Sequence, residues 1–329
     1  MAVSGNRRGE IGIGLLGCGV VGSAVARALA RHAGVIGRHA GSLPVIRAVA
    51  VRNVRKRRDV PVAADLFSGD AWQVATRPDV DVVVEVIGGL DPAGDAIEAA
   101  LRAGKHVVTA NKELLAHQFA KLHDCAAASG RLLLFEAAVM AGTPAVSTVR
   151  SLAGDRIRKL QGVLNGTSNF CLHRMQAGLT LAEAVAQAQA RGYAERDPSA
   201  DIEGRDAAAK LAILAAVAFG RPASLDEVTV TGITRLRHAD LVTAASQGQA
   251  VRLVAEARDE DGRISATVAP AFLDSSHPLA SVRGHHNGLL VDADLAGQLF
   301  IQGPGAGGDA TASAILTDIV RAARPCGSR

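Results

Sequence analysis

Short apolar runs alternate with segments of helical periodicity between residues 10 and 137. The run EIGIGLLG begins at residue 10, a helix-like segment begins at Val20, and LPVIRAVAVR follows over 43–52. Further β-type runs cover 79–89, 105–110 and 131–137, and a helical segment covers 92–104. Strands that are buried on both faces have this uniform apolar character. Strands that alternate with helices predict an α/β fold, here a Rossmann-type, doubly wound parallel sheet.

Gly17, Gly19 and Gly22 span the junction of the first run and the first helix, in the stretch GLLGCGVVG (14–22). In a dinucleotide site Gly17 permits the turn, Gly19 lets a pyrophosphate approach the backbone, and Gly22 lets the helix pack closely on the strand. The same spacing also occurs in simple turns, but its place between a strand and a helix favours the dinucleotide. We therefore expect the cofactor to bind at Gly17, Cys18, Gly19, Val20, Val21 and Gly22.

A basic run follows the second apolar segment, where an NAD-binding protein usually carries an acid for the ribose hydroxyl. This chain has VRNVRKRRDV there, and Arg52, Lys56 and Arg57 are the expected cofactor ligands. Positive charge suits the 2′-phosphate of NADP. A solvated basic loop is the alternative, so NAD remains open. Nucleic acid is not expected as a partner, because aromatic residues are only 3% of the chain and no further basic stripe supports the run.

The remaining bulk features limit the class of protein. A length of 329 residues predicts two domains. The cysteines at 18, 125, 171 and 326 form no CxxC pair, which argues against a zinc site or a disulfide framework. The first ten residues lack the apolar core of a signal peptide, and no apolar run is long enough for a membrane span. We expect a cytoplasmic protein without a membrane partner.

A cluster of acids precedes an apolar helix in the second half of the chain. Such a cluster repels itself unless a cation, a lysine or an ammonium-bearing ligand lies among its members, which are Glu195, Asp197, Asp201, Glu203 and Asp206. Just before it, Thr180 and Glu183 form a capping box that predicts a helix to about Arg191.

Lys210 is the only charged residue between Ala207 and Phe219. Asp206 and Lys210 are four residues apart, so they share one face of the helix. Most such pairs are surface salt bridges of little energetic weight, but Lys210 stands among apolar residues, where a cation needs a reason. The neighbouring carboxylate favours the ammonium form, which suits a proton donor in carbonyl reduction.

These motifs resemble the homoserine dehydrogenase family. The resemblance covers about residues 11–322 and is most specific in VVTANK (107–112), NGTSN (165–169), GYAERDPSADIEGRDAAAK (192–210) and GPGAGGDATASAI (303–315). It implies NAD(P)-dependent interconversion of L-homoserine and L-aspartate 4-semialdehyde, a step towards threonine, methionine and isoleucine. It also implies a homodimer, here of the short form without a kinase or a C-terminal regulatory domain.

The resemblance assigns roles to individual residues. Lys210 would be the general acid/base, with Asp206 as its partner, and Lys112 would lie between the nicotinamide and the substrate. The implied substrate ligands are Glu195, which would hold the amino group, together with Asp201, Asp206, Gly166 and Thr167. Two alternatives stay open: a role for Lys112 only as the start of a surface helix, and a role for Gly166 and Thr167 only in a turn.

Two glycine-containing segments complete the expected site. FEAAVMAGTP (135–144) is similar to a monovalent-cation loop, which implies a sodium ion on the Glu136 carboxylate and on the carbonyls of Val139, Ala141 and Thr143. A plain domain hinge is the alternative. The terminal glycine segment implies Gly307 near the cofactor, with a flexible joint as the alternative and Asp309 as a helix N-cap in either case.

The expected organisation follows from these segments. An NAD(P)-binding domain covers 1–143, an α+β substrate and dimerisation domain covers 144–300, and a closing segment over 301–329 returns to the nucleotide domain. In the second domain the helices 180–191 and 206–219 should pack on a sheet that includes 226–233 and 251–259. Two other readings remain: a dehydrogenase with a cysteine nucleophile, and a dinucleotide-binding sensor without catalysis.

Overall fold

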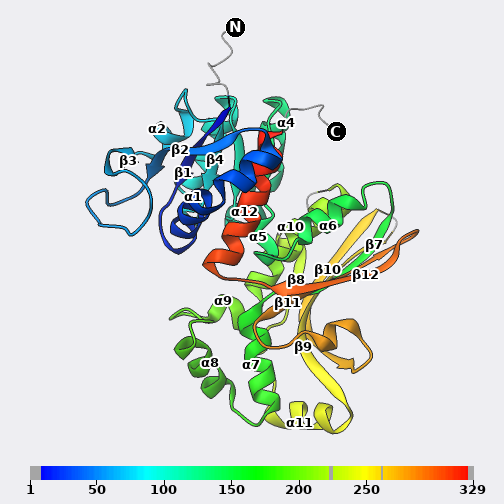
Figure 1. Cartoon of the computed structure of the whole chain (residues 1–329). Helices are drawn as coiled ribbons and strands as arrows, with labels where there is room; N and C mark the ends of the chain where they lie inside the picture. The colour runs from blue at the N-terminus through cyan, green and yellow to red at the C-terminus, as the bar shows by residue number, and fades with distance from the viewer. Residues whose placement is uncertain (1–8, 222–224, 261, 325–329) are drawn as a thin grey trace. The chain divides into compact units, whose positions relative to one another are not determined.

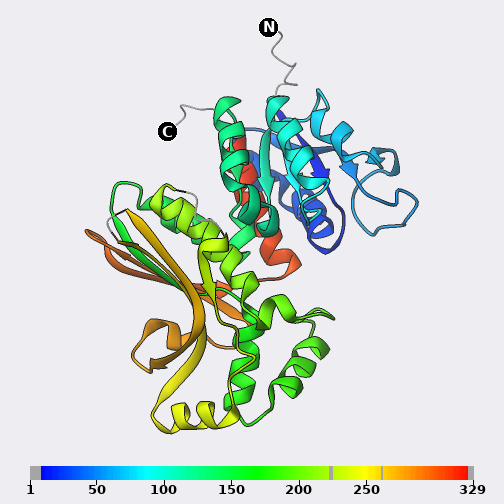
Figure 2. The same ribbon diagram turned by 180° about the vertical axis from the view of Figure 1, so that it is seen from behind.

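The structure, a computed structural model, describes residues 9–221, 225–260 and 262–324. Residues 1–8 lie outside the described residues, so the expectation that the first ten residues form no signal peptide falls mostly outside them. Cys326 also lies outside the described residues. The chain divides into two compact units (Figures 1 and 2). Unit 1 comprises residues 1–142 and 307–329, and unit 2 comprises residues 143–306.

Unit 1 is built on a parallel sheet in the strand order β3-β2-β1-β4-β5-β6. The order reverses between β1 and β4, and ligands of open α/β sheets bind beyond the strand ends at such a point. The Rossmann-type fold class is therefore confirmed. The strands are β1 Glu10–Leu16, β2 Leu43–Ala50, β3 Phe67–Ser68, β4 Val82–Glu85, β5 His106–Thr109 and β6 Leu133–Leu134.

The helices of unit 1 cover this sheet, and the last of them comes from the far end of the chain. The helix α12, red in Figure 1, packs beside α1, and Ile315 and Ile319 share a core with Ile13 and Leu15. The helices are α1 Val20–Ala40, α2 Ala71–Thr76, α3 Ala93–Arg102, α4 Lys112–Ala128, α5 Ala137–Met140 and α12 Gly308–Ala323, with a 3₁₀ turn over Ala64–Leu66.

Three local expectations for unit 1 need correction. The run 79–89 contains only the four-residue strand β4, because the Glu85 carboxylate accepts hydrogen bonds from the amides of Ile87 and Gly88 and turns the chain. The run 131–137 contains only β6, because the chain enters α5 directly after Glu136. Asp309 lies inside the first turn of α12, whose N-cap is Gly307 without a side-chain hydrogen bond.

Unit 2 holds a mixed sheet in the order β12-β11-β7-β9-β10-β8, antiparallel except for the β10–β8 pair. Its strands are β7 Ile157–Val163, β8 Val228–Val230, β9 Gln249–Glu260, β10 Arg263–Asp274, β11 His286–Ala293 and β12 Gly297–Pro304. The expected strands at 226–233 and 251–259 therefore both belong to this sheet.

The helices of unit 2 are dominated by α10, which packs on β7, β9 and β10 as the sequence predicts. The capping box of Thr180 and Glu183 begins α8 as expected, but α8 packs mainly on α7 rather than on the sheet, because its buried side chains are only Ala184 and Ala188. The helices are α6 Ala145–Ser151, α7 Gly166–Gln176, α8 Leu181–Ala190, α9 Ser199–Ile202, α10 Arg205–Phe219 and α11 His238–Ser246, with 3₁₀ turns over Leu225–Glu227 and Pro278–Ser281. Among the described residues no helix has the length and apolar character that a bilayer crossing requires.

Candidate active site

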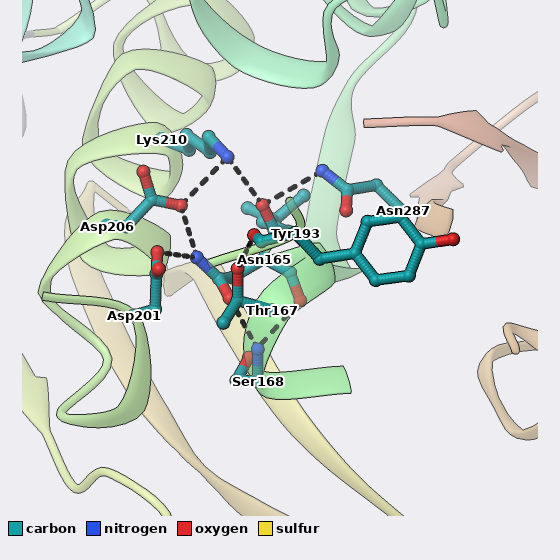
Figure 3. A network of polar contacts seen from close by, with 9 residues as sticks. Asn165, Thr167, Ser168, Tyr193, Asp201, Asp206, Lys210 and Asn287 are labelled. Atoms are coloured by element: carbon teal, nitrogen blue, oxygen red, sulfur yellow. Dashed lines mark hydrogen bonds and ion pairs between the residues drawn. The ribbon is translucent and has the colours of Figure 1, made fainter. Parts of the chain in front are cut away.

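Lys210 and Asp206 meet on the first turns of α10, as their spacing predicts. The Nζ atom of Lys210 lies 2.8 Å from Oδ2 of Asp206 and donates a second hydrogen bond of 2.8 Å to the carbonyl oxygen of Leu164 (Figure 3). Lys210 is 8% exposed and Asp206 7%. An ion pair at this depth is costly to desolvate unless further hydrogen bonds satisfy it. Here Asn165, the residue before α7, donates to Asp206, and the Leu164 carbonyl accepts from Lys210.

Asn165 explains how two of the clustered carboxylates lie close together. Its Nδ2 donates to Oδ1 of Asp201 at 2.6 Å and to Oδ2 of Asp206 at 2.8 Å. Its Oδ1 accepts the amide of Ser168 at 2.7 Å, so the same side chain is the N-cap of α7. Burial raises the pKa of Asp201, the charge of Asp206 raises it further, and the hydrogen bond from Asn165 acts against both.

The other acids of the cluster serve local structure or face solvent. Asp197 accepts the amide of Ser199 at the start of α9, and Glu203 pairs with Arg205. Glu195 is exposed, and no partner of its carboxylate is found among the described residues. The structure therefore brings Asp201 and Asp206 together around Asn165 and leaves the Glu195 carboxylate available to a ligand.

The predicted substrate residues Gly166 and Thr167 form the first turn of α7. Gly166 packs so tightly against the backbone of His285 that an added Cβ would stand 2.4 Å from its carbonyl oxygen. The hydroxyl of Thr167 donates to the carbonyl of Tyr193 at 2.7 Å, which fastens the turn to the segment that carries Glu195. The ring of Tyr193 stacks on His285 at a centroid distance of 4.6 Å.

The raised pKa of Asp201 predicts a pH-dependent stability. A carboxyl group whose pKa rises on folding holds its proton more tightly in the folded state, so its contribution is favourable below the unfolded-state pKa and is lost as the pH rises. Asp201→Asn keeps the acceptor oxygen for Asn165 and cannot ionise. We expect its Tm to exceed that of the parent by a few degrees at pH 7, with the difference vanishing below about pH 4.

Asp197→Asn provides the control for this measurement. Hydrogen bonds from the backbone and side chain of Ser199 lower the pKa of Asp197, whereas the pKa of Asp201 is raised. The ionised form of Asp197 therefore stabilises the folded state. That variant should be less stable than the parent at pH 7, and the difference should disappear as the pH falls below about 4. A Tm difference for Asp201→Asn that is independent of pH would contradict the burial argument.

The three glycines of the turn between β1 and α1 have different surroundings. Gly17 has φ +103°, and a Cβ on it would lie 2.7 Å from the carbonyl oxygen of Val86. A Cβ on Gly22 would lie 2.1 Å from the carbonyl oxygen of Gly17, whereas a Cβ on Gly19 would meet no atom of the described chain within 4 Å. Close packing explains Gly17 and Gly22, and the open space at Gly19 fits an approaching ligand.

The residues around this turn divide between surface and core. Val20, at the N-terminus of α1, is 79% exposed, whereas Val21 packs against the core of unit 1. The Sγ atom of Cys18 lies 3.6 Å from Oγ of Ser23. Gly307 is the N-cap of α12, and the next glycine would place a Cβ 3.3 Å from Val20, so the two helix N-termini of unit 1 lie side by side.

Lys112 is the exposed first residue of α4, immediately after β5. Asn111 caps the helix by accepting the amide of Leu114, and its Nδ2 donates to the carbonyl of Gly89 at 2.7 Å.

The sequence did not point to Glu85, a fully buried carboxylate at the end of β4 that accepts the hydroxyl of Thr109 at 2.6 Å. Burial raises the pKa of Glu85, while its hydrogen bonds oppose that rise.

The basic run forms an exposed loop after β2. The Asn53 side chain accepts the amides of Arg55 and Lys56 and so shapes the turn. Arg58 is used by the fold, since it donates to the carbonyl of Lys56 and lies over the ring of Phe67. Arg52, Lys56 and Arg57 are exposed, and none of their side chains pairs with an acid in the described part of the chain.

The segment proposed for a cation contains one unusual backbone conformation. Ala141 has φ +45° and ψ −111°, and among the described residues it is the only one other than glycine with positive φ. Its carbonyl has no hydrogen-bond donor in the described chain, although the residue is 4% exposed. The Glu136 carboxylate lies 3.7 Å from the guanidinium of Arg321, and the Thr143 hydroxyl donates to the carbonyl of Pro304 in unit 2.

The cysteines give no support to a covalent mechanism. Burial raises the pKa of Cys171 to about 11, which keeps the thiol protonated near neutral pH. Cys18, Cys125 and Cys171 are all free. The glycine turn of unit 1 and the buried lysine pair of unit 2 fit one class of protein, the dinucleotide-dependent oxidoreductases.

Comparison with known proteins gives the family. A family model described as the NAD binding domain of homoserine dehydrogenase matches residues 17–136, and one described as homoserine dehydrogenase matches residues 144–320. The chain belongs to the homoserine dehydrogenase family, and it is an oxidoreductase that interconverts L-homoserine and L-aspartate 4-semialdehyde in amino-acid biosynthesis.

Individual relatives agree with this assignment. The homoserine dehydrogenase of Corynebacterium glutamicum is 44% identical over 321 residues, which cover 95% of this chain and 72% of that protein. The crystal structure of a homoserine dehydrogenase from Thiobacillus denitrificans has a TM-score of 0.91 at 39% identity and covers 96% of this chain and 73% of that one. A hyperthermophilic archaeal homoserine dehydrogenase, solved in complex with NADPH, has a TM-score of 0.82 at 30% identity. The match covers 95% of this chain and 97% of that one.

Proposed function

We propose that Lys210 is the general acid/base of the reaction. Reduced nicotinamide, when bound, supplies the hydride that the aldehyde carbon of L-aspartate 4-semialdehyde accepts. The Lys210 ammonium donates its proton to the oxygen of that carbonyl as the alcohol forms, and Asp206 holds the lysine side chain in place by an ion pair. The observation that carries this proposal is the buried Lys210, with Nζ 2.8 Å from both Asp206 and the Leu164 carbonyl.

The same proposal assigns the substrate ligands. Glu195 would bind the substrate ammonium, for which its exposed and unpaired carboxylate is suited. Asp201 and Asp206 contribute negative charge on the same side of Asn165, while Gly166 and Thr167 contribute backbone and hydroxyl groups. Lys112 would lie against the nicotinamide and the substrate, since it follows the carboxyl end of a parallel strand.

NADP is the proposed cofactor, with NAD as the alternative. Gly17, Cys18, Gly19, Val20, Val21, Gly22 and Gly307 would hold the pyrophosphate region, which the open space at Gly19 supports. Arg52, Lys56 and Arg57 would bind the 2′-phosphate, because their exposed charges have no acidic partner. The archaeal relative solved with NADPH supports the same choice.

A coenzyme comparison tests this assignment. We expect Arg57→Ala and Lys56→Ala each to raise the KM for NADP about tenfold, because a charged hydrogen bond to the phosphate contributes about 1.5–3 kcal/mol, and to change the KM for NAD less than about twofold. The measurement is the absorbance of reduced nicotinamide during L-homoserine oxidation with each cofactor. Arg31→Ala, an exposed charge on α1, is the control. Equal losses with both cofactors would remove the phosphate assignment.

The remaining proposals concern the ion, the assembly and the location. The segment 136–143 would bind a monovalent cation such as sodium, which accepts oxygen ligands. The partnerless carbonyl of strained Ala141 supports this, and carbonyls of Val139 and Thr143 would add to it. Glu136 already lies near Arg321, so its carboxylate is the weaker part of the set. We further propose a cytoplasmic homodimer, with unit 1 as the nucleotide domain and unit 2 as the substrate and dimerisation domain.

A further inference from the structure

The Lys210 ammonium has three N–H groups, and the structure accounts for two of them. One points to Asp206 and one to the Leu164 carbonyl, both at 2.8 Å, and the described residues offer no acceptor for the third. Each of the two acceptors also receives a side-chain amide. Asn165 Nδ2 donates to Asp206 at 2.8 Å, and Asn287 Nδ2 donates to the Leu164 carbonyl at 2.9 Å.

We propose that Asn165 and Asn287 are positioning residues, which fix the two acceptors so that the third N–H direction of Lys210 is the only one open to proton transfer. Figure 3 shows Lys210 and Asn287 approaching the same carbonyl oxygen from two sides. The inference rests on the proposed role of Lys210 and deepens it. Neither asparagine needs to touch a reacting atom.

Both amides are held in one orientation. Asn165 cannot turn over, because its Oδ1 accepts the Ser168 amide and its Nδ2 faces two carboxylates. Asn287 is fully buried, and a Cβ on Gly305 would stand 2.2–2.3 Å from all three atoms of its amide group. A reversed Asn287 amide would set its oxygen against the Leu164 carbonyl oxygen. Packing and hydrogen bonding therefore give each amide a single arrangement.

The network suits both protonation states of the lysine. In carbonyl reduction one N–H bond breaks and an O–H bond forms on the substrate oxygen, which leaves a neutral amine with two N–H groups. Those two groups still satisfy Asp206 and the Leu164 carbonyl, and the lone pair takes the third direction. In the reverse reaction that lone pair accepts the hydroxyl proton. No heavy atom has to move between the two states, which is the benefit of a preorganised site.

The two polar atoms of the Asn287 amide differ in their partners. Its Oδ1 is buried and accepts no hydrogen bond from the described residues. A buried polar atom without a partner is unfavourable, and an apolar residue of similar shape would avoid that penalty. Among the described residues the side chain of Asn287 makes one hydrogen bond, from Nδ2 to the Leu164 carbonyl, so Nδ2 is the atom through which Asn287 acts on the lysine network.

The test uses Asn287→Leu, which removes Nδ2 and the unpartnered Oδ1 together. We expect kcat to fall about tenfold while the KM for L-homoserine stays within about twofold. The rising limb of the pH profile for L-homoserine oxidation should move upward by about half a pH unit. The reason is that a carbonyl relieved of its second donor attracts the ammonium more strongly. The Tm should be unchanged or higher.

Asn169→Leu is the matched control. Asn169 lies on α7, is equally buried, and also has an Oδ1 without a partner, but its Nδ2 donates to the Val282, Gly284 and His286 carbonyls and not to the lysine network. The rising limb of the pH profile of Asn169→Leu should lie at the same pH as that of the parent. If Asn287→Leu does not fold, Asn165→Ser retains the N-cap and removes the amide N–H groups, and the same upward shift is expected.

Lys210→Met, measured in parallel, separates the two levels of the argument. Normal turnover of that variant would overturn the role of Lys210 and this inference with it. An inactive Lys210→Met beside an Asn287→Leu enzyme with unchanged kcat and unchanged pH limb would overturn only the positioning role. A pH shift of equal size in Asn169→Leu would also overturn it, since the effect would then follow from buried-amide loss in general.

Discussion

Lys210→Met lowers kcat by about 10²–10⁴-fold, the usual range for loss of a general acid/base. The methionine side chain has nearly the same length and fills the same space beside Asp206, but it has no transferable proton. The KM for L-homoserine should change less than about threefold, because the group acts mainly in the transition state. Steady-state rates in both directions, followed by nicotinamide absorbance, provide the measurement.

Lys159→Met is the control for this substitution. Lys159 lies on β7 of the same unit and pairs with Asp292 at 3.2 Å, and about a quarter of each side chain is exposed. Loss of a pair of this kind costs at most about 1 kcal/mol, so its kcat should equal that of the parent. Near-normal turnover of a folded Lys210→Met enzyme would refute the acid/base role.

Much of unit 1 could be predicted because its elements are local and its sheet is parallel. The step from β1 through the glycine turn into α1 is visible as a change from an apolar run to helical spacing. Strand ends are less visible, because residues outside the strand decide them. The Glu85 side chain, for example, ends β4 by accepting two backbone amides beyond it.

The strand order of unit 2 could not be predicted, because its sheet joins distant segments. β7 lies between β9 and β11, so its neighbours come from much later in the chain. Nothing in the local pattern of 157–163 selects those partners over others. The packing of α8 on α7 has the same cause, since two buried alanines give little indication of which surface they will meet.

The candidate site shows the same division between local and distant information. The i, i+4 spacing predicts the contact of Asp206 with Lys210, and an asparagine before α7 is readable as an N-cap. That Asn165 also binds Asp201 and Asp206 depends on tertiary structure. Asn287 gives no local signal, because it reaches the Leu164 carbonyl from 123 residues away. Sequence patterns therefore identify the lysine and its carboxylate but not the amides that hold them.

Gly19→Ala raises the KM for the dinucleotide about tenfold or more, while the Tm stays within a degree or so of the parent. The added methyl group meets no atom of the described chain within 4 Å, so we expect no loss of folding stability. It does occupy the space through which a pyrophosphate would approach the turn, and each tenfold loss of affinity corresponds to about 1.4 kcal/mol. Cofactor titration by nicotinamide fluorescence and thermal unfolding are the two measurements.

Gly22→Ala is the informative partner of that variant. A Cβ on Gly22 would stand 2.1 Å from the carbonyl oxygen of Gly17, a backbone atom that cannot swing aside, so the turn and α1 must separate. Its Tm should fall by several degrees, and cofactor affinity should fall with it. The contrast assigns Gly22 to packing and Gly19 to the ligand. A Gly19→Ala protein that binds the dinucleotide normally would mean that the open space at this turn is not where the phosphates lie.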